Sequence, residues 1–458
     1  MTNKPNIILI TSDQLRPYEL GCYGGTEVAT PNIDRLAARG AVWETAISNF
    51  PVCMPARSIM MSGQMNRTAT GGKTNVSHGG RPGDFTMPEY PYPGRPHLRD
   101  PTLPELLRDA GYHTAAIGKW HIHSWPDDIG FDDYLIPRVH HAHSAQTYTR
   151  NGGPEFCAPG YSVDFEAGEA ETFLTGRARE DQPFFLYYNI SPPHCPVADV
   201  PEEFLKLYDP DSLTLRENTD EAAIEDKDYW YRVYRWDFRY YSHRLPHTLE
   251  LPKGYDLRAL AAEYFGAVTW MDRAVGRILN AVAAAGLEED TLIVFTADHG
   301  ENLGSHGLVQ KGTENDESIC IPLVMTGPGV VAGHRVAGSV ASLVDLAPSF
   351  LAAVGQGAPE HMHGTSLMAE AGGGRGDGRT AFFETGNGAG LRSPEATIYA
   401  RFEAPRHLAE TPATLFDNTN DPFQYQNLAS AQPDHPLMAD LARRDAALPW
   451  RDLEDDPQ

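Results

Sequence analysis

Two short, unbroken apolar runs limit the folds open to this chain. Residues 6–10 and 291–295 show no alternation of apolar and polar side chains. A strand alternates when one of its faces meets water, so a continuous apolar run indicates a strand covered by helices on both faces. Residues 184–188 and 114–117 are weaker runs of the same kind. We expect all four to be parallel strands of one buried sheet.

Helical patterns separate these runs. Residues 102–110 have Pro104 near their start and Gly111 after their end, which are typical positions for these residues at helix termini. A longer pattern, residues 257–285, is apolar at helical spacing and is followed by Gly286. Alternating strand and helix patterns predict an α/β fold with a large, doubly wound, mostly parallel sheet flanked by helices.

Residues 124–254 interrupt this alternation. The stretch is rich in His, Pro, Tyr and Arg, and most of it has no clear period. Long loops in compact domains often carry functional residues. We therefore expect inserted loops here, close to a functional site.

A Gly-rich run at residues 370–379 indicates a surface loop or linker. Beyond it we expect two short strands and a helix, at residues 380–384, 396–400 and 436–447. The predicted organisation is a large N-terminal α/β domain, residues 1–369, and a smaller C-terminal subdomain with a short antiparallel sheet and a helix, residues 370–458.

The charge of the chain excludes two classes of partner. Its 37 Lys and Arg residues and 62 Asp and Glu residues give a formal net charge of −25. Nucleic acids and anionic membranes need a basic surface, so neither is an expected partner. No run approaches the ~18 consecutive apolar residues of a membrane-spanning helix. The same charge should repel an anionic substrate unless the site itself is positive.

The N-terminal residues and the cysteines bear on the cellular compartment. The chain turns polar directly after the apolar residues 7–10, so we expect no secretory signal. The five cysteines are widely spaced and odd in number, which is not the pattern of a disulfide framework. We therefore expect a cytoplasmic protein.

Candidate metal ligands follow both strong strands. Asp13 and Gln14 come after the first strand, and Asp298 and His299 come after the second. Because ligands bind outside the carboxyl ends of parallel strands, these side chains should meet at one edge of the sheet. Two carboxylates, an amide oxygen and an imidazole suit one divalent cation. Either aspartate alone would suit a helix cap, but their occurrence at both strand ends favours a metal.

A third motif, Cys53-Met-Pro-Ala-Arg57, resembles the Cys-x-Pro-x-Arg signature of the type I (formylglycine-dependent) sulfatases of the alkaline phosphatase superfamily. Further motifs stand in that family's order, from residue 5 to about 430: Asp13-Gln14 and residues 30–36, 118–121, 192–194, 298–301, 304–311 and 415–417. Ordered motifs over nearly the whole chain are a much more specific signal than a single Cys-x-Pro-x-Arg.

This resemblance implies a sulfuric ester hydrolase with a modified nucleophile. A formylglycine-generating enzyme would convert Cys53 to formylglycine (3-oxoalanine) during maturation. One hydroxyl of its hydrate, activated by the metal, would attack sulfur, and the second would expel sulfate. A plain cysteine lacks the second hydroxyl. The implied substrate is a small-molecule sulfate ester: an aryl, alkyl or sugar sulfate.

The resemblance also implies roles for residues around the nucleophile. Arg57 would hold the aldehyde hydrate or a sulfate oxygen, and Lys119 would contact the sulfate. His121 would assist sulfate release, and His194 is the candidate general acid near the leaving group. Lys311 would stabilise the sulfate and the charge that develops on the leaving oxygen.

The implied metal ligands are Asp13, Gln14, residue 53, Asp298 and His299. This set of ligands does not decide which metal ion is bound. Many sulfatases have a second aspartate at the position of Gln14 and an asparagine at that of His299. Ca²⁺ strongly prefers oxygen ligands, whereas Mn²⁺ or Zn²⁺ accepts imidazole. The family favours Ca²⁺, and Mn²⁺, Mg²⁺ and Zn²⁺ stay open.

Two other functions stay open. The same Asp-Gln and Asp-His pairs occur in the related phosphonate monoester and phosphodiester hydrolases. The combination of Lys119, His121, His194 and Lys311 favours the sulfatase over that alternative. If Cys53 is never modified, the protein would instead be a non-catalytic anion-binding protein.

Two clusters have no assigned role. Histidines at positions 121, 123, 140, 141 and 143 could form a second metal site, although a polar pocket wall is the favoured interpretation. Residues 228–241 interleave aromatic and Arg side chains, which fits either a pocket lid or a subunit interface. A homo-oligomer therefore stays open.

Overall fold

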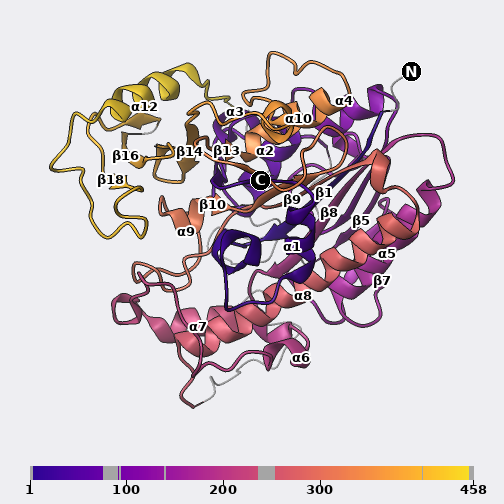
Figure 1. The fold of residues 1–458 in the computed structure, drawn as a ribbon, viewed down its shortest axis with the longest axis horizontal. Coiled ribbons are helices and arrows are strands. Elements are labelled where there is room, and N and C mark those ends of the chain that lie inside the picture. Colours follow the sequence, from indigo (N-terminus) through magenta and orange to yellow (C-terminus); the bar gives the residue numbers. More distant parts are fainter. Residues whose placement is uncertain are drawn as a thin grey trace.

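The computed structural model describes residues 4–75, 91, 94–138, 141–235, 253–404 and 406–452. Its centre is a ten-stranded sheet in the order β12-β2-β11-β9-β1-β8-β4-β5-β6-β7 (Figure 1). Five neighbouring strands run parallel: β9 (Thr291–Ala297), β1 (Asn6–Asp13), β8 (Phe184–Pro193), β4 (His113–Gly118) and β5 (Asp133–Pro137). The predicted α/β class, with its large, mostly parallel sheet, is confirmed.

The four apolar runs of the sequence form the middle of this sheet. β1 lies between β9 and β8, with Ile7 opposite both Leu292 and Phe185. These three side chains are fully buried. The sheet continues on either side in shorter strands: β11 (Leu323–Thr326), β2 (Ala41–Trp43) and β12 (His334–Val336) beyond β9, and β6 (Thr147–Arg150) and β7 (Phe156–Cys157) beyond β5.

Helices cover both faces of the sheet. One face carries α1 (Pro31–Ala38), α5 (Ser162–Arg177) and α8 (Leu257–Ala284), and the other carries α2 (Cys53–Ser62), α4 (Leu103–Asp109) and α10 (Leu346–Ala353) (Figure 1). A capping box between Thr102 and Glu105 begins α4. Asp256 begins α8 by accepting a hydrogen bond from the Ala259 N–H at 3.0 Å. The two helices expected from the sequence are therefore present.

The expectation of long loops over residues 124–254 is wrong for part of that stretch. Besides β8, it contains β5 to β7 and the 16-residue helix α5. The buried face of α5 includes the small side chains of Ala167 and Ala170. A buried face built partly from alanine gives a weak apolar period, so the pattern did not identify the helix.

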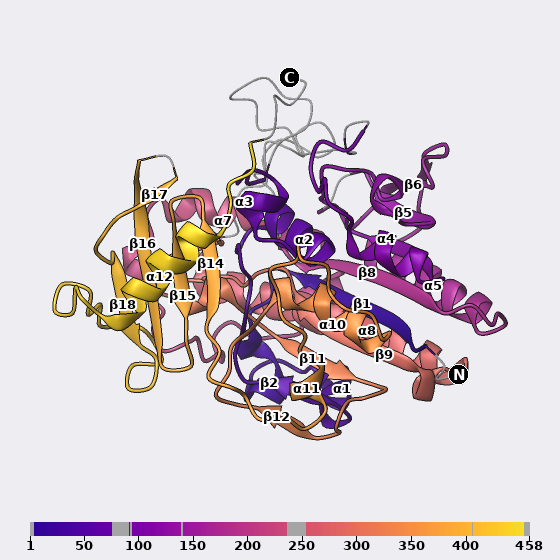
Figure 2. The same ribbon diagram turned by 90° about the horizontal axis from the view of Figure 1, so that it is seen from above.

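The C-terminal region adds a second, antiparallel sheet beside the large one (Figure 2). It comprises β14 (Ala381–Thr385), β15 (Gly388–Arg392), β16 (Ala396–Ala404), β17 (His407–Leu408) and β18 (Thr414–Asp417), followed by α12 (Pro436–Ala447). Buried ion pairs join it to the rest of the chain: Arg67 with Glu384 at 2.5 Å and Arg392 with Asp316 at 2.9 Å. The predicted antiparallel sheet and helix are confirmed, and the boundary at residue 370 stays a prediction.

The remaining strands and α-helices of the described residues are short. They are the three-stranded sheet β10 (Cys320–Ile321), β3 (Ala46–Ile47) and β13 (Ala341–Ser342), and the helices α3 (Asn66–Ala69), α6 (Glu202–Leu205), α7 (Lys227–Arg235), α9 (Asp316–Ile319) and α11 (Met368–Ala371). Within the described residues, no helix has the length and apolar character needed to cross a membrane.

Candidate active site

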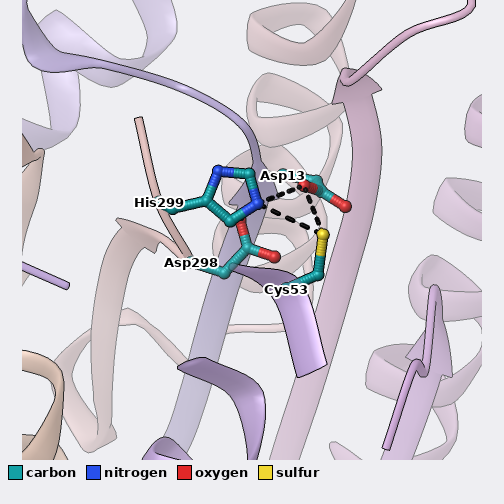
Figure 3. Close-up of side chains that lie close together, drawn as sticks. All are labelled: Asp13, Cys53, Asp298 and His299. Carbon is teal, nitrogen blue, oxygen red and sulfur yellow. Dashed lines mark hydrogen bonds and ion pairs between the residues drawn. The ribbon is translucent and has the colours of Figure 1, made fainter. Parts of the chain in front are cut away.

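The carboxyl ends of β1 and β9 bring four predicted side chains to one point. Asp13 ends β1, Asp298 and His299 follow β9, and Cys53 is the first residue of α2. All four are fully buried, and they point toward one another (Figure 3). The sheet edge expected from the two strand-end motifs is therefore the place where these residues meet.

The distances within this group fit a shared cation. His299 Nε2 lies 3.3 Å from Asp13 Oδ1 and 3.5 Å from Asp298 Oδ1. With metal–ligand bonds of about 2.0–2.6 Å, ligand atoms at adjacent positions around one ion lie about 3–3.5 Å apart. The two carboxylates and the imidazole therefore have the chemistry and the spacing of a divalent metal site.

Hydrogen bonding and burial prepare His299 for this role. Its Nδ1 donates to the Gly300 carbonyl oxygen at 2.9 Å, which leaves Nε2 without a proton and facing the two carboxylates. Burial lowers the pKa of His299 to about 3, so the ring is neutral near pH 7. A neutral imidazole whose second nitrogen is held by a carbonyl is the usual form of a metal-ligating histidine.

Gln14 contacts both Asp298 and Lys311. Its backbone takes a left-handed conformation, with φ of 64°, and its N–H donates to Asp298 Oδ1 at 3.1 Å. The side-chain oxygen accepts a hydrogen bond from Lys311 Nζ at 2.8 Å, while the amide nitrogen donates to Glu301. The oxygen of Gln14 therefore faces the site, as a metal ligand or a partner of Lys311 would.

Cys53 sits among charged groups but is itself neutral. Its Sγ is 3.2 Å from His299 Nε2, 3.3 Å from Lys311 Nζ and 3.6 Å from Asp13 Oδ1. Burial raises the pKa of the Cys53 thiol, and the nearby cation of Lys311 offsets only part of that effect. The unmodified side chain is therefore a protonated thiol near neutral pH, which is a weak nucleophile.

Arg57 is buried one helical turn after Cys53, and its donors contact protein groups. Its Nε donates to Asp298 Oδ2 at 3.0 Å, and its Nη2 lies 3.6 Å from Asp13 Oδ2. Its Nη1 donates to Asn189 Oδ1 at 2.9 Å and to the Lys119 carbonyl oxygen at 3.1 Å. In this structure Arg57 thus balances the two carboxylates, and the predicted contact with substrate stays a prediction.

Lys119, Lys311 and His194 also contact this group of residues. Lys119 Nζ makes a close ion pair with Asp13. Lys311 Nζ lies 2.6 Å from His194 Nε2, and His194 Nδ1 donates to the Cys195 carbonyl oxygen at 2.6 Å. Burial, followed by the cations of Lys311 and Lys119, lowers the pKa of His194 well below its usual range. The neutral ring therefore accepts from Lys311.

Two protein-family models match this chain, and together they cover residues 5–448. The model of the sulfatase family matches residues 5–356, and that of the N-sulphoglucosamine sulphohydrolase C-terminal region matches residues 304–448. The chain belongs to the sulfatase family. It is thus a sulfuric ester hydrolase of the alkaline phosphatase superfamily, as the motifs predicted.

Relatives of this sulfatase-family chain cover most of its length. The ulvan-active sulfatase of Formosa agariphila is 27% identical over 441 residues, which cover 93% of this chain and 77% of that relative. The N-acetylglucosamine-6-O-sulfatase of Bacteroides thetaiotaomicron is 27% identical over 420 residues, covering 80% and 70%. The crystal structure of the phosphonate monoester hydrolase of Agrobacterium radiobacter has the same fold, with a TM-score of 0.68, 22% identity and coverage of 97% and 95%.

His121, another predicted residue of this sulfatase-family site, is connected to His194 through a third histidine. It follows β4 in a left-handed conformation, with φ of 47°. Its ring centroid is 6.3 Å from that of His141, which in turn stacks on His194. The chain of rings His121–His141–His194 thus links it to the site.

The sequence named His141 only as one of the cluster of histidines that could form a second metal site or a polar pocket wall. Its ring stacks on His194 with centroids 3.7 Å apart and planes 4° from parallel, and its Nδ1 is 3.3 Å from Lys119 Nζ. One ligand atom from each of Asp13, His141 and His194 falls within a span of 4.8 Å. The cluster of histidines was the available signal, but only the fold shows which of them faces the site. His140 lies outside the described residues.

Glu301 is a second residue whose place the sequence did not indicate. It belongs to the Asp298-His-Gly-Glu301 motif and is fully buried. One of its oxygens accepts from the Leu303 and Gln310 N–H groups at 2.8 and 2.7 Å, and the other accepts from Gln14. Glu301 therefore contacts the side chain of Gln14 and does not belong to the candidate metal group.

Proposed function

We propose that this protein hydrolyses a small-molecule sulfate monoester to an alcohol and inorganic sulfate, with Cys53 converted to formylglycine and one divalent metal ion. A single arrangement carries the proposal: a buried Cys53 at a helix N-terminus, within 3.3 Å of Lys311 Nζ and 3.2 Å of His299 Nε2. It combines the residue to be modified, a cation for an anionic substrate and a candidate metal ligand.

The metal would be held by Asp13, Asp298 and His299, with Gln14 and residue 53 completing the set. A divalent ion there would supply Lewis-acid activation of the residue-53 hydroxyl. The carboxylates and the amide oxygen fit Ca²⁺, the family's metal, and the imidazole keeps Mn²⁺, Mg²⁺ and Zn²⁺ open. Elemental analysis of the purified protein identifies the ion.

The proposed modification overcomes the weakness of the buried thiol. As formylglycine hydrate, made with the help of a formylglycine-generating enzyme, residue 53 would offer one hydroxyl for attack on sulfur and a second to expel sulfate. The N-terminus of α2 adds partial positive charge beside the sulfate. Lys311, close to both residue 53 and His194, can stabilise the sulfate and the negative charge on the leaving oxygen.

His194 is placed to serve the leaving group. Because its Nδ1 is fixed by the Cys195 carbonyl oxygen, Nε2 is the atom that can carry a proton toward the site. A bound sulfate ester brings a negative charge, which raises the pKa of a nearby imidazole. In the complex, His194 would therefore donate a proton from Nε2 to the leaving oxygen as the ester bond breaks.

The substrate class is an aryl, alkyl or sugar sulfate, and two relatives named for ulvan and N-acetylglucosamine favour a sugar sulfate. Comparison of kcat/KM over a panel of sulfate esters tests this choice. We expect measurable turnover of sulfate monoesters and a higher kcat/KM for a sugar sulfate than for simple alkyl sulfates. Equal values across the panel would contradict the preference for sugars.

A phosphonate monoester or phosphodiester hydrolase is the second candidate. The Asp13-Gln14 and Asp298-His299 pairs favour it, and the fold is shared with a phosphonate monoester hydrolase. Measuring kcat/KM for matched aryl sulfate and aryl phosphonate esters separates the two activities. A clear preference for the phosphonate would overturn the sulfatase assignment.

The third candidate, a non-catalytic anion-binding protein, makes a different prediction. In that case intact-protein mass spectrometry of material made with the native maturation system would find an unmodified Cys53, and the protein would bind sulfate esters without turnover.

The proposed sulfatase function includes a cytoplasmic location, which is expected from the cysteine pattern. Cell fractionation tests this location.

A further inference from the structure

Glu301 accepts four hydrogen bonds, two from nearby backbone N–H groups and two from the side chains of residues far away in the sequence. Its Oε1 accepts from the Tyr234 hydroxyl at 2.5 Å, the Leu303 N–H at 2.8 Å and the Gln310 N–H at 2.7 Å. Its Oε2 accepts from the Gln14 amide nitrogen. Glu301 and Tyr234 are fully buried, so these contacts are made away from solvent.

The contact with Gln14 determines which way that amide faces. An amide presents an oxygen on one side and an NH₂ group on the other. Since the NH₂ group of Gln14 donates to Glu301, its oxygen is left to face Lys311 Nζ at 2.8 Å. With the amide reversed, an NH₂ group would face the ammonium and the candidate metal, which is repulsive.

The contacts with Gln310 hold the residue that precedes Lys311. Gln310 has a left-handed backbone, with φ of 66°, which costs free energy in a non-glycine residue. Its N–H donates to Glu301 and to the Tyr234 hydroxyl, the latter at 3.0 Å. Its carbonyl oxygen accepts from the Asn302 N–H at 2.9 Å. Both backbone polar groups of Gln310 are therefore held by hydrogen bonds.

Tyr234 belongs to the aromatic and Arg-rich segment whose role the sequence left open. It lies in α7 (Lys227–Arg235), together with buried Tyr231 and Val233. The Tyr231 hydroxyl donates to Glu221 at 2.9 Å, away from Glu301. Residues 236–241 lie outside the described part of the chain, so the lid and interface interpretations of that half stay predictions.

We infer that Glu301, supported by Tyr234 of α7, is a positioning residue that sets the Gln14 oxygen and Lys311 together toward the reacting groups. This inference rests on the proposed function, because the cation and sulfate that Gln14 and Lys311 would meet belong to it. The first half of the aromatic segment thereby gains a role, because its Tyr234 supports Glu301, which in turn positions Gln14 and Lys311.

The decisive variant is Glu301→Gln. The new amide cannot turn its NH₂ group toward the N–H groups of Leu303 and Gln310, because both are donors. It must point that NH₂ group at Gln14, which then has to reverse its own amide. The double variant Gln14→Glu with Glu301→Gln restores the pattern, since a carboxylate at position 14 can accept from the new amide and still offer an oxygen to Lys311.

Crystal structures of the metal-free proteins and titrations with Ca²⁺ test this inference. In Glu301→Gln we expect the residue-14 oxygen to leave Lys311 Nζ, Ca²⁺ to bind about 10–100-fold more weakly, and kcat to fall while KM changes less. The double variant should recover the oxygen contact and most of the Ca²⁺ affinity. An unchanged Gln14 oxygen in Glu301→Gln, or a double variant no better than the single one, would overturn the inference.

A milder pair covers the case in which Glu301→Gln does not fold. Tyr234→Phe removes one hydrogen bond to Glu301, and we expect kcat to fall about fivefold. Tyr231→Phe, on the same helix but bonded to Glu221, should leave kcat unchanged; equal kcat in both variants would contradict the role of Tyr234.

The metal-free crystal structures show the position of Gln14 even if the protein binds no divalent ion or hydrolyses no sulfate ester. Failure of the proposed function is therefore distinguished from failure of this inference.

Discussion

Two buried carboxylates, Asp298 and Glu166, meet opposite electrostatic surroundings. Burial acts to raise the pKa of Asp298, but His299, Arg57, Lys119 and Lys311 outweigh it and lower that pKa to about 2. Burial also raises the pKa of Glu166 in α5, and there the pKa reaches about 8. Asp298 is therefore charged near pH 7, whereas Glu166 is mostly protonated.

The hydrogen bonds explain the difference. Asp298 accepts from Arg57 Nε at 3.0 Å and from the Gln14 N–H at 3.1 Å. Glu166 accepts from the Tyr148 hydroxyl at 2.8 Å, and its second oxygen has no hydrogen-bond partner among the described residues. Nearby cations keep the buried Asp298 ionised at the candidate active site, whereas no such cation in the described part of the chain offsets the burial of Glu166.

The comparison predicts opposite results for the same chemical change at the two sites. Asp298→Asn leaves the buried Arg57 guanidinium without its main charge partner, so the free energy of unfolding should fall by about 3–5 kcal/mol. Loss of a proposed metal ligand should also lower kcat/KM by about 10³-fold or more. Urea unfolding and steady-state kinetics measure the two effects. A stable, active Asp298→Asn protein would show that the cations do not depend on this carboxylate.

A smaller effect is expected when one cation of the site is removed. Lys311→Ala deletes the ammonium that contacts Cys53, Gln14 and His194, so kcat should fall by about 10²–10³-fold. The matched control is Lys206→Ala, which removes an exposed lysine paired with Glu202. Equal kcat values for the two variants would contradict the role given to Lys311.

Glu166→Gln should change stability without changing kcat. With a folded pKa of about 8 and an unfolded value near 4.5, Glu166 binds a proton in the folded state that the unfolded state releases between these values. Stability should therefore fall as pH rises from about 4.5 to 8, with a slope on the order of 1 kcal/mol per pH unit from this residue.

Glu166→Gln should remove that component of the pH dependence and stabilise the protein at pH 8, as thermal unfolding over a pH series will measure. Glu169→Gln, on the same helix and paired with Arg150 near the surface, is the control. If both variants keep the wild-type slope, Glu166 is ionised in the folded protein and the contrast with Asp298 fails.

The smallest effect concerns salt. The net charge of −25 should repel an anionic substrate at long range, while Arg57, Lys119, Lys311 and the proposed divalent cation would make the site locally positive. At about 0.15 M salt the Debye length is about 8 Å, so distant surface acids are largely screened from the site. Added salt should leave kcat/KM unchanged or raise it slightly. A steep fall would mean that long-range attraction, not the local cations, brings the substrate in.

The sequence was sufficient for the parts of the fold and site that depend on neighbouring residues. The apolar run before Asp13 and the run before Asp298 indicate strands, and the position directly after a parallel strand indicates where each side chain lies. Cys53 and Arg57 were found in the same way, from a local motif. These residues required no knowledge of which segments pack together.

Residues placed by tertiary packing were not predictable in this way. Nothing local separates Glu166 from the half-buried acids of α5, because its burial depends on the contacts of the whole helix. His141 is one of several neighbouring histidines, and only the fold stacks it on His194. Tyr234 reaches Glu301 across 67 positions of sequence. Each of these contacts is set by packing rather than by sequence spacing.

The central claim is that residue 53 acts as formylglycine in sulfate ester hydrolysis. The most direct test varies the co-expressed formylglycine-generating enzyme, measures the converted fraction of residue 53 by mass spectrometry and compares it with kcat for an aryl sulfate. We predict that kcat rises in proportion to the converted fraction and is zero for unconverted protein. Lasting turnover by fully unmodified protein, or none by fully converted, metal-loaded protein, would contradict the claim.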